Sequence, residues 1–361
     1  MKNFNVAVLG YGISKERTEA VSINTLKLEK KLRKFSKKVL RINLGYKNKY
    51  FYSGNSLAQA LFLYPFVITN LIFLLKKKKV THVHDVFVLP LASLFFTLPL
   101  KLFFPQIIFI KEIQNDAGSS QKFHLETLIR MLTNRQWMLN ILLKSFKCYT
   151  KNLSISKKYS ITYLPLSIGI YKKGRKKSKS LRVSYLGHPL KKKGIDVFPQ
   201  IFESLPSDLK NTIVFSFALS DVGPRDQVKK MLSKSAKENG VKVSFSNRVK
   251  PHSFFSKQDL YVLPIHDQFS AVSTPNTLLE AMEAGAIPIV TRLSSLTGIV
   301  SHNKTAFLIK NITAKKIIQL LKKIEGNQNS LQTLRNNGRQ YILENYSNKK
   351  VNKVLERIYE T

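Results

Sequence analysis

The segment Ser273–Val290, STPNTLLEAMEAGAIPIV, combines a polar turn, a short helix and an apolar strand. Its proline-containing turn leads into a predicted helix at Leu278–Glu283, Gly285 ends that helix, and Ile287–Val290 follows as a strand. The turn and the helix N-terminus present backbone N–H groups that suit a phosphate. Glu280 is placed to accept hydrogen bonds from sugar hydroxyls. Phosphate beside ribose is what a nucleotide-sugar offers, so the segment indicates the donor half of a sugar transferase.

Strand and helix signals alternate around this segment. Helices are predicted at Pro224–Glu238 and Thr313–Glu325, and the tail Ser330–Tyr359 has a helical pattern that breaks near Asn345–Ser347. The alternation predicts a parallel sheet covered by helices. The predicted strands are Leu181–Leu186, Ile213–Phe217, Val241–Phe245, Leu260–Leu263, Ile287–Thr291 and Ala306–Ile309.

The first half of the chain shows the same alternation. A linker separates the halves, because Tyr171–Ser180, YKKGRKKSKS, carries six positive charges. Two α/β domains in tandem with a cleft between them are therefore predicted. The strands of the first half are Val6–Gly10, Val39–Asn43, Val80–His84, Gln106–Ile110, Lys147–Thr150 and Tyr159–Leu164, and its helical stretches are Ser22–Phe35, Ala58–Leu75, Val86–Phe104 and Leu125–Phe146.

The apolar run Leu57–Leu75 is long enough to span a membrane. It contains Pro65 and Asn70, however, and the lysines Lys76–Lys79 that follow it lead into a predicted core strand. A helix packed on the sheet, a helix lying in the membrane interface and a membrane span are all compatible with this pattern.

The net charge of +39 is unevenly distributed. Residues 1–180 hold 33 basic and 7 acidic residues, a net of +26, whereas the remainder holds 27 and 14, a net of +13. Such a field favours an anionic bilayer, nucleic acid or a phosphate-rich substrate, although a lysine-rich codon usage would give the same excess. Without a recognised nucleic-acid-binding module, nucleic acid is not an expected partner.

The cellular setting is inferred from the cysteine content and the N-terminus. Cys148 is the single cysteine, so no internal disulfide can form, which fits a reducing compartment. The first residues, MKNFNVAVLGYG, read as a short strand and lack the long apolar core of a signal peptide. We therefore expect a cytoplasmic protein, peripheral on the cytosolic face of a membrane.

Several motifs of the second half resemble the family 4 retaining glycosyltransferases of the GT-B fold, also called glycosyl transferases group 1. They are Tyr185–Gly194, YLGHPLKKKG; Asp259–Pro264, DLYVLP; and Pro275–Gly285, PNTLLEAMEAG. Ala306–Ile309 is similar to the strand that follows, with His302–Asn303 in place of the usual Asn-Gly turn. In the first half the resemblance is weaker and rests on His82–Asp85 and Tyr163–Ile168, YLPLSI.

The resemblance implies two Rossmann-like domains that face each other across a cleft. Residues 1–170 would form an N-terminal acceptor-binding domain, 171–180 the basic linker, and 181–345 the nucleotide-sugar-binding domain. A C-terminal helix over 346–361 could cross back to the N-terminal domain.

The same resemblance assigns the site residues. Lys193 would contact the donor diphosphate and offset the charge of the leaving group, and Lys111 takes the second catalytic position. Either lysine could instead be a surface residue, with Lys111 in a salt bridge at a strand end. The donor-binding set is Gly187, His188, Lys193, Pro275, Asn276, Thr277, Leu278 and Glu280, and the acceptor or cleft set is Gly10, Gly12, His84 and Glu112.

Three positions depart from the family pattern. Val272 replaces a glutamate that handles the transferred sugar, His188 replaces an arginine, and Lys111 aligns with a histidine. These departures leave open a degenerate protein that binds a nucleotide or glycan without turnover.

We expect no metal and no cofactor other than the substrate. His82 and His84 share a strand face without a third ligand, and no Asp-x-Asp pair suited to a Mg²⁺–diphosphate is found. The predicted activity is transfer of a sugar, with retention, from a nucleotide-sugar to a hydroxyl. The acceptor would be a glycan or lipid-linked molecule of envelope polysaccharide or glycoconjugate synthesis, reached from an anionic membrane surface.

Overall fold

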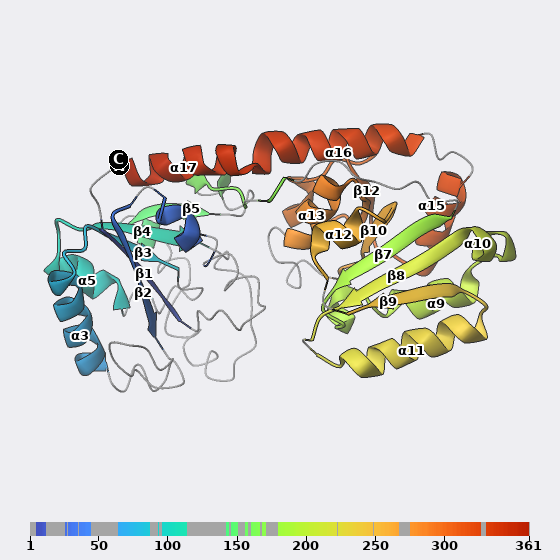
Figure 1. The fold of residues 1–361 in the computed structure, drawn as a ribbon, viewed down its shortest axis with the longest axis horizontal. Coiled ribbons are helices and arrows are strands. Elements are labelled where there is room, and N and C mark those ends of the chain that lie inside the picture. The colour runs from blue at the N-terminus through green and yellow to red at the C-terminus, as the bar shows by residue number, and fades with distance from the viewer. Residues whose placement is uncertain are drawn as a thin grey trace. The chain divides into compact units, whose positions relative to one another are not determined.

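The computed structural model divides the chain into two compact units. Unit 1 comprises Met1–Leu164 and Asn352–Thr361, and unit 2 comprises Pro165–Val351. Each unit is built on its own sheet (Figure 1). The structure describes residues 5–11, 26, 28–34, 36–44, 64–86, 93, 96–113, 142–143, 146–150, 156–157, 160–166, 168–170, 180–221, 223–247, 249–266, 275–325 and 330–360.

The sheet of unit 1 has six parallel strands in the order β2-β1-β3-β4-β5-β6. Parallel neighbours require crossovers, which is why helical and strand signals alternate in the sequence. The strands are β1 (Asn5–Tyr11), β2 (Lys38–Leu44), β3 (His82–Asp85), β4 (Ile108–Ile113), β5 (Lys147–Thr150) and β6 (Thr162–Tyr163).

Helices α3 (Tyr64–Lys77) and α5 (Leu98–Phe103) pack against this sheet. Val67, Leu71 and Leu74 are buried on α3 at helical spacing, and they join Leu9 and other strand residues in one core. The apolar run before Lys76 therefore contributes a packed helix in its described part. None of the described helices is both long enough and apolar enough to cross a membrane.

Unit 2 has a second parallel sheet, ordered β12-β11-β10-β7-β8-β9. From β7 the chain adds β8 and β9 on one side and then returns to add β10, β11 and β12 on the other. The order thus reverses between β7 and β10. The strands are β7 (Leu181–Gly187), β8 (Ile213–Leu219), β9 (Lys242–Ser246), β10 (Leu260–Leu263), β11 (Ile287–Thr291) and β12 (Phe307–Ile309).

The two faces of the unit 2 sheet have separate hydrophobic cores. One core includes Val183 and Phe215 and is covered by α9 (Val197–Ser204), α11 (Arg225–Glu238) and α15 (Ala314–Glu325), with α10 (Ser207–Thr212) beside β8. The other includes Tyr261 and Val290. Its helices are α12 (Pro251–Phe255), α13 (Asn276–Ala284), α14 (Ser294–Thr297) and α16 (Ser330–Tyr346).

The C-terminal segment contributes to both units. Helix α16 ends at Tyr346, Ser347 forms a parallel bridge with Ile168, and α17 then runs over Asn348–Glu360. From Asn352 onward α17 belongs to unit 1. The predicted helical tail with a break near Asn345–Ser347 is confirmed.

The loop after β7 makes the closest backbone approach among the described glycines. Gly194 has a φ of +79°, and a Cβ added there would lie 1.9 Å from the carbonyl oxygen of Pro264, just after β10. Gly240 also has a positive φ, +64°, but no atom lies within 4 Å of its added Cβ. A comparison of the two glycines therefore distinguishes the effect of a left-handed φ from that of a steric clash.

We expect Gly194→Ala to lower the free energy of unfolding by about 3 kcal/mol, because it combines a left-handed φ with a clash against backbone. The control, Gly240→Ala, carries only the conformational term and should lose about 1 kcal/mol. Urea unfolding followed by far-UV circular dichroism measures both. Equal losses would show that the loop moves freely away from Pro264.

Candidate functional site

The sequence from Pro275 to Val290 forms α13 and most of the strand that follows it, β11. Pro275 caps the helix in an extended conformation, and the Leu278 N–H donates to its carbonyl at 3.1 Å. Gly285, with a φ of +87°, ends the helix in the left-handed conformation. Helix α13 is longer at both ends than predicted. Gly285 ends it as predicted, and β11 follows.

One face of α13 is partly accessible. Asn276, Thr277 and Glu280 lie at helical spacing on this face, whereas the remaining side chains, from Leu278 onward, are buried. The first N–H groups of a helix have no acceptor within it, so the same end of α13 offers donors and a positive dipole end. Three of the predicted donor-binding residues therefore share one surface.

Tyr261 joins this helix to the end of β7. Its hydroxyl lies 2.8 Å from Thr277 Oγ1 and 3.3 Å from the Leu186 carbonyl oxygen. Burial raises the pKa of Tyr261, so the phenol keeps its proton. The phenol has one proton, which it donates to the Leu186 carbonyl oxygen. Thr277 therefore donates to the phenol oxygen.

A second tyrosine shapes the loop after β7. The Tyr185 hydroxyl donates to the His188 carbonyl oxygen at 2.7 Å, and it would lie 3.3 Å from a Cβ at Gly187. His188 Nδ1 lies 2.6 Å from Ser220 Oγ, and the Ser220 N–H donates to the Gly187 carbonyl at 3.0 Å. Gly187 and His188 are thus held between the ends of β7 and β8.

Lys193 differs from the two lysines before it. Lys191–Lys193 forms a short 3-10 helix, in which the Lys193 N–H donates to Leu190 at 2.8 Å and Gly194 follows as the cap. Lys191 and Lys192 are exposed, whereas Lys193 is half-buried. The fold therefore sets one lysine of the run apart.

The loops that carry the predicted donor residues meet at the carboxyl ends of the central strands of the unit 2 sheet. Gly187 ends β7, and Thr277 is tied through Tyr261 to Leu186 of the same strand end. This is the place where the strand order reverses, and the carboxyl ends of strands at such a reversal are where open α/β sheets bind ligands.

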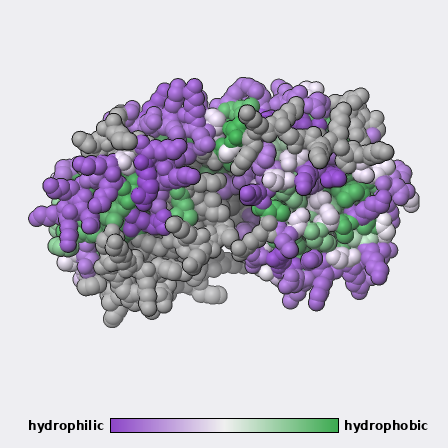
Figure 2. Space-filling model, in the orientation of Figure 1, coloured by the Kyte–Doolittle hydropathy of each residue, from purple (hydrophilic) through white to green (hydrophobic). Residues whose placement is uncertain are grey.

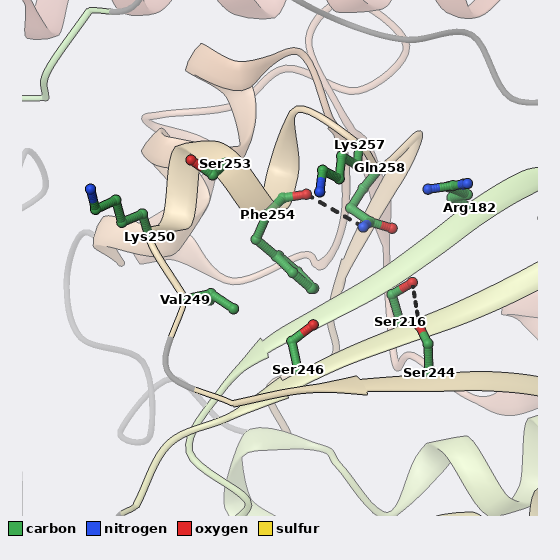
Figure 3. A pocket seen from close by; sticks show the side chains of 10 residues that line it. All are labelled: Arg182, Ser216, Ser244, Ser246, Val249, Lys250, Ser253, Phe254, Lys257 and Gln258. Atoms are coloured by element: carbon green, nitrogen blue, oxygen red, sulfur yellow. Dashed lines mark hydrogen bonds between the residues drawn. The ribbon is translucent and has the colours of Figure 1, made fainter.

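A cavity of about 390 Å³ occupies a different part of unit 2 (Figure 3). It lies over the face of β7, β8 and β9 that carries Ser216 and Ser244, whose hydroxyls are 3.1 Å apart, and it is bordered by α12. None of the predicted donor residues lines it. The cavity is therefore not the site that the sequence motifs indicate.

In unit 1 the predicted cleft residues His84 and Glu112 lie in a buried polar cluster. His84 Nε2 is 2.7 Å from the Tyr149 hydroxyl, which donates to Glu112 Oε2 at 2.7 Å. His84 Nδ1 contacts the Tyr359 hydroxyl of α17. Because the Tyr149 hydroxyl donates its proton to Glu112, its oxygen accepts from the imidazole at Nε2.

The phenols of this cluster are neutral. Burial raises the pKa of Tyr149 well above its ordinary value, and the neighbouring Glu112 carboxylate raises it further. Burial alone raises the pKa of Tyr359. The rings of His82 and His84 both lie beside Tyr359, so the two histidines share a face, as the strand spacing predicts.

Lys111 is also buried, with an exposed fraction of 1%. Its Nζ donates to Asp85 Oδ1 at 2.9 Å. Strand β4 extends to Ile113, beyond the predicted end at Ile110, so Lys111 and Glu112 lie inside the strand. The alternative of a surface salt bridge at a strand end is wrong, because the ion pair is in the interior.

The remaining predicted positions are only partly covered. Gly10 lies in β1, in register with Asn43 of β2, whereas Gly12 and Val272 fall outside the described residues. Within the described ranges, no three His, Cys, Asp or Glu side chains are grouped to hold a metal.

Sequence reasoning missed the residues that hold the predicted site residues in place within each unit. Tyr185, Tyr261 and Ser220 in unit 2, and Asp85, Tyr149 and Tyr359 in unit 1, had no predicted role. Tyrosines within apolar strands were the available signal, because a buried phenol needs a hydrogen-bond partner.

Comparison with known proteins finds a family match within unit 2. Residues 170–341 match the family Glycosyl transferases group 1. An uncharacterized glycosyltransferase of Methanocaldococcus jannaschii, MJ1069, is 25% identical over 201 residues, 54% of this chain and 49% of the relative. CapM of Staphylococcus aureus, a capsular polysaccharide biosynthesis glycosyltransferase, is 23% identical over 183 residues, 50% of this chain and 46% of the relative. The matches thus span about half the length of these relatives.

The fold of the whole chain is matched by solved structures. HepE of Anabaena, crystallised in complex with UDP, superposes with a TM-score of 0.70 at 11% identity, and the superposition covers 99% of each chain. This chain has two parallel sheets of six strands, each flanked by helices. It has the GT-B fold of glycosyltransferases, and its residues 170–341 match the family Glycosyl transferases group 1.

Proposed function

We propose that the protein is a glycosyltransferase that moves a sugar from a nucleotide-sugar to a hydroxyl. The observation that carries the proposal is the junction at the strand reversal of unit 2. There Tyr261 ties the start of α13 to the end of β7, within the region that matches the glycosyltransferase family. HepE, which shares the fold, is crystallised with UDP and with UDP-glucose, and this supports a nucleotide-sugar as the donor.

In the proposed donor site the backbone N–H groups at the start of α13 face the diphosphate, and Glu280 accepts from the ribose hydroxyls. Lys193 neutralises the charge that grows on the departing nucleoside diphosphate. We propose that transfer proceeds with retention. We also propose that it is independent of metal ions, because the helix dipole and Lys193 supply the positive charge that a divalent cation would otherwise provide.

The acceptor is proposed to be a glycan or a lipid-linked molecule of envelope polysaccharide or glycoconjugate synthesis. The name of CapM, a capsular polysaccharide biosynthesis enzyme, supports this class. The net charge of +26 in residues 1–180 supports a position on the cytosolic face of an anionic membrane. Gly10 would border the acceptor. His84, Glu112 and Lys111 are buried, and they would reach substrate only if their hydrogen bonds and the ion pair with Asp85 opened.

The alternative is a protein that binds a nucleotide or glycan without turnover. The burial of Lys111 and the presence of His188 and Val272 at family positions favour it. Assays with a panel of UDP- and GDP-sugars decide between the two, since release of UDP or GDP requires transfer or hydrolysis. Nucleotide binding without release from any donor would support the alternative.

We expect Glu280→Ala to weaken nucleotide-sugar binding by roughly 1–3 kcal/mol, because the ribose hydroxyls lose a charged acceptor. Isothermal titration calorimetry with UDP- and GDP-sugars measures the change. Glu203→Ala, which removes an exposed glutamate from α9, is the matched control and should bind as the wild type does. Unchanged affinity in a folded Glu280→Ala variant would remove Glu280 from the site.

Lys193→Ala should lower kcat by about 100-fold with a smaller change in KM, because its charge acts on the leaving group in the transition state. Lys192→Ala removes the adjacent exposed lysine and should leave both constants near wild type. Steady-state kinetics on the donor found by the panel gives the comparison. A pure KM effect would assign Lys193 to ground-state binding, and equal effects of both variants would deny it a specific role.

Activity should be unchanged after treatment with EDTA, because the proposed site uses Lys193 and the helix N-terminus in place of a cation. Release of the nucleoside diphosphate is measured before and after chelation. Loss of activity that Mg²⁺ or Mn²⁺ restores would contradict metal independence without affecting the assignment as a transferase.

A further inference from the structure

Large hydrophobic side chains are exposed together on unit 1. Among the described residues, Leu102, Phe103 and Phe73 are the most exposed large hydrophobics, at 78%, 62% and 61%. They lie on α3 and α5, which pack against each other and stand side by side in Figure 1. Exposure of several such side chains on neighbouring helices marks an interaction surface more often than single exposed ones do.

The pattern along α3 separates an inner from an outer face. Val67, Leu71 and Leu74 face the core, whereas Phe73 lies on the other side with the exposed Lys76 and Lys77. On α5, Leu100 is buried and the exposed Leu102 and Phe103 follow it. Phe73, Leu102 and Phe103 therefore lie outside the hydrophobic core of unit 1.

Positive charge lies beside Phe73. Lys76 and Lys77 are exposed one turn further along α3, and Lys77 Nζ lies 5.4 Å from the centre of the Phe73 ring. Lys101, which precedes Leu102, is half-buried, and its Nζ lies 5.7 Å from the centre of the Phe146 ring. Between Tyr64 and Lys111 the single acidic residue is Asp85, which is buried. In Figure 2, hydrophilic side chains cover most of the visible described surface of unit 1, with hydrophobic ones between them.

We propose that this surface docks on an anionic lipid bilayer. The α3–α5 patch consists of Phe73, Leu102 and Phe103 with Lys76 and Lys77. The apolar side chains would enter the headgroup–acyl boundary, while the lysines extend their ammonium groups to lipid phosphates. A protein partner would need acidic residues to match the lysines around an apolar centre, whereas an anionic membrane supplies both layers over a continuous plane.

The inference extends the proposed function by naming the surface that meets the membrane, and it makes no use of the donor site. Each lysine near an anionic surface contributes attraction that salt screens, and each inserted aromatic or leucine adds a contribution that salt does not screen. The two contributions can therefore be removed separately.

The test is co-sedimentation of the full chain with phosphatidylcholine vesicles, with and without phosphatidylglycerol. Wild type should bind only the phosphatidylglycerol vesicles. At low salt, Lys76→Gln/Lys77→Gln should lower the partition coefficient by about tenfold. At high salt, this variant and wild type should bind equally. Phe73→Ser/Leu102→Ser/Phe103→Ser should lower it by about tenfold or more at every salt concentration.

The control variant is Ile170→Ser/Met231→Ser, which changes the two other large exposed hydrophobics among the described residues, each 40% exposed, both in unit 2. It should bind vesicles as wild type does. Circular dichroism and UDP binding in vesicle-free solution should be unchanged in the patch variants. A failure of wild type to bind UDP would count against the proposed function, whereas the vesicle result would stand by itself.

Three results would overturn the proposal. The first is vesicle binding of the Phe73→Ser/Leu102→Ser/Phe103→Ser variant equal to that of wild type, and the second is no vesicle binding by wild type. The third is a wild-type dimer that this variant dissociates, measured by sedimentation velocity, which would make the patch a contact between two copies of the chain.

Discussion

The candidate site depends on one buried phenol. Tyr261 lies in the interior of unit 2, where its hydroxyl must find partners or carry a desolvation penalty. It finds them in Thr277 and in the Leu186 carbonyl, and this pair of contacts fixes the start of α13 against the end of β7. The end of β7 and the start of α13 are positioned by the same oxygen atom, so the geometry of the candidate site is a product of core packing.

Unit 1 uses buried polar groups in a different way. His84, Tyr149, Glu112 and Tyr359 form a chain of hydrogen bonds, and Asp85 and Lys111 form an ion pair beside it. A buried network of this kind is stable only when its members satisfy one another, because each unpaired group would be costly in the interior. The same low-dielectric setting raises the pKa of Cys148 to about 12, mainly through burial, so its thiol is inert at neutral pH.

Much of the fold follows from the sequence, because parallel sheets covered by helices produce apolar strands at regular intervals. All six strands of unit 2 and the break at Ser347 were predicted, with ends that differ by a few residues. The end of β4 was not, since Lys111 and Glu112 were expected to end the strand at the cleft, and only their partners on β3 and β5 explain their burial. Glu280 was predicted to lie on the helix and Thr277 in the turn before it, whereas α13 includes both. The contact between Thr277 and Tyr261 joins residues that are 16 positions apart and has no local signature.

The contact between His84 and Tyr359 joins positions 275 residues apart in the chain. A ribosome delivers the strands of unit 1 first, yet the phenol that completes their buried cluster emerges only after all of unit 2 has been made. Domains generally fold as they leave the ribosome. Here unit 2 has its whole sequence available before unit 1 does, and His84 in the sheet of unit 1 lacks its last partner until Tyr359 has been synthesised.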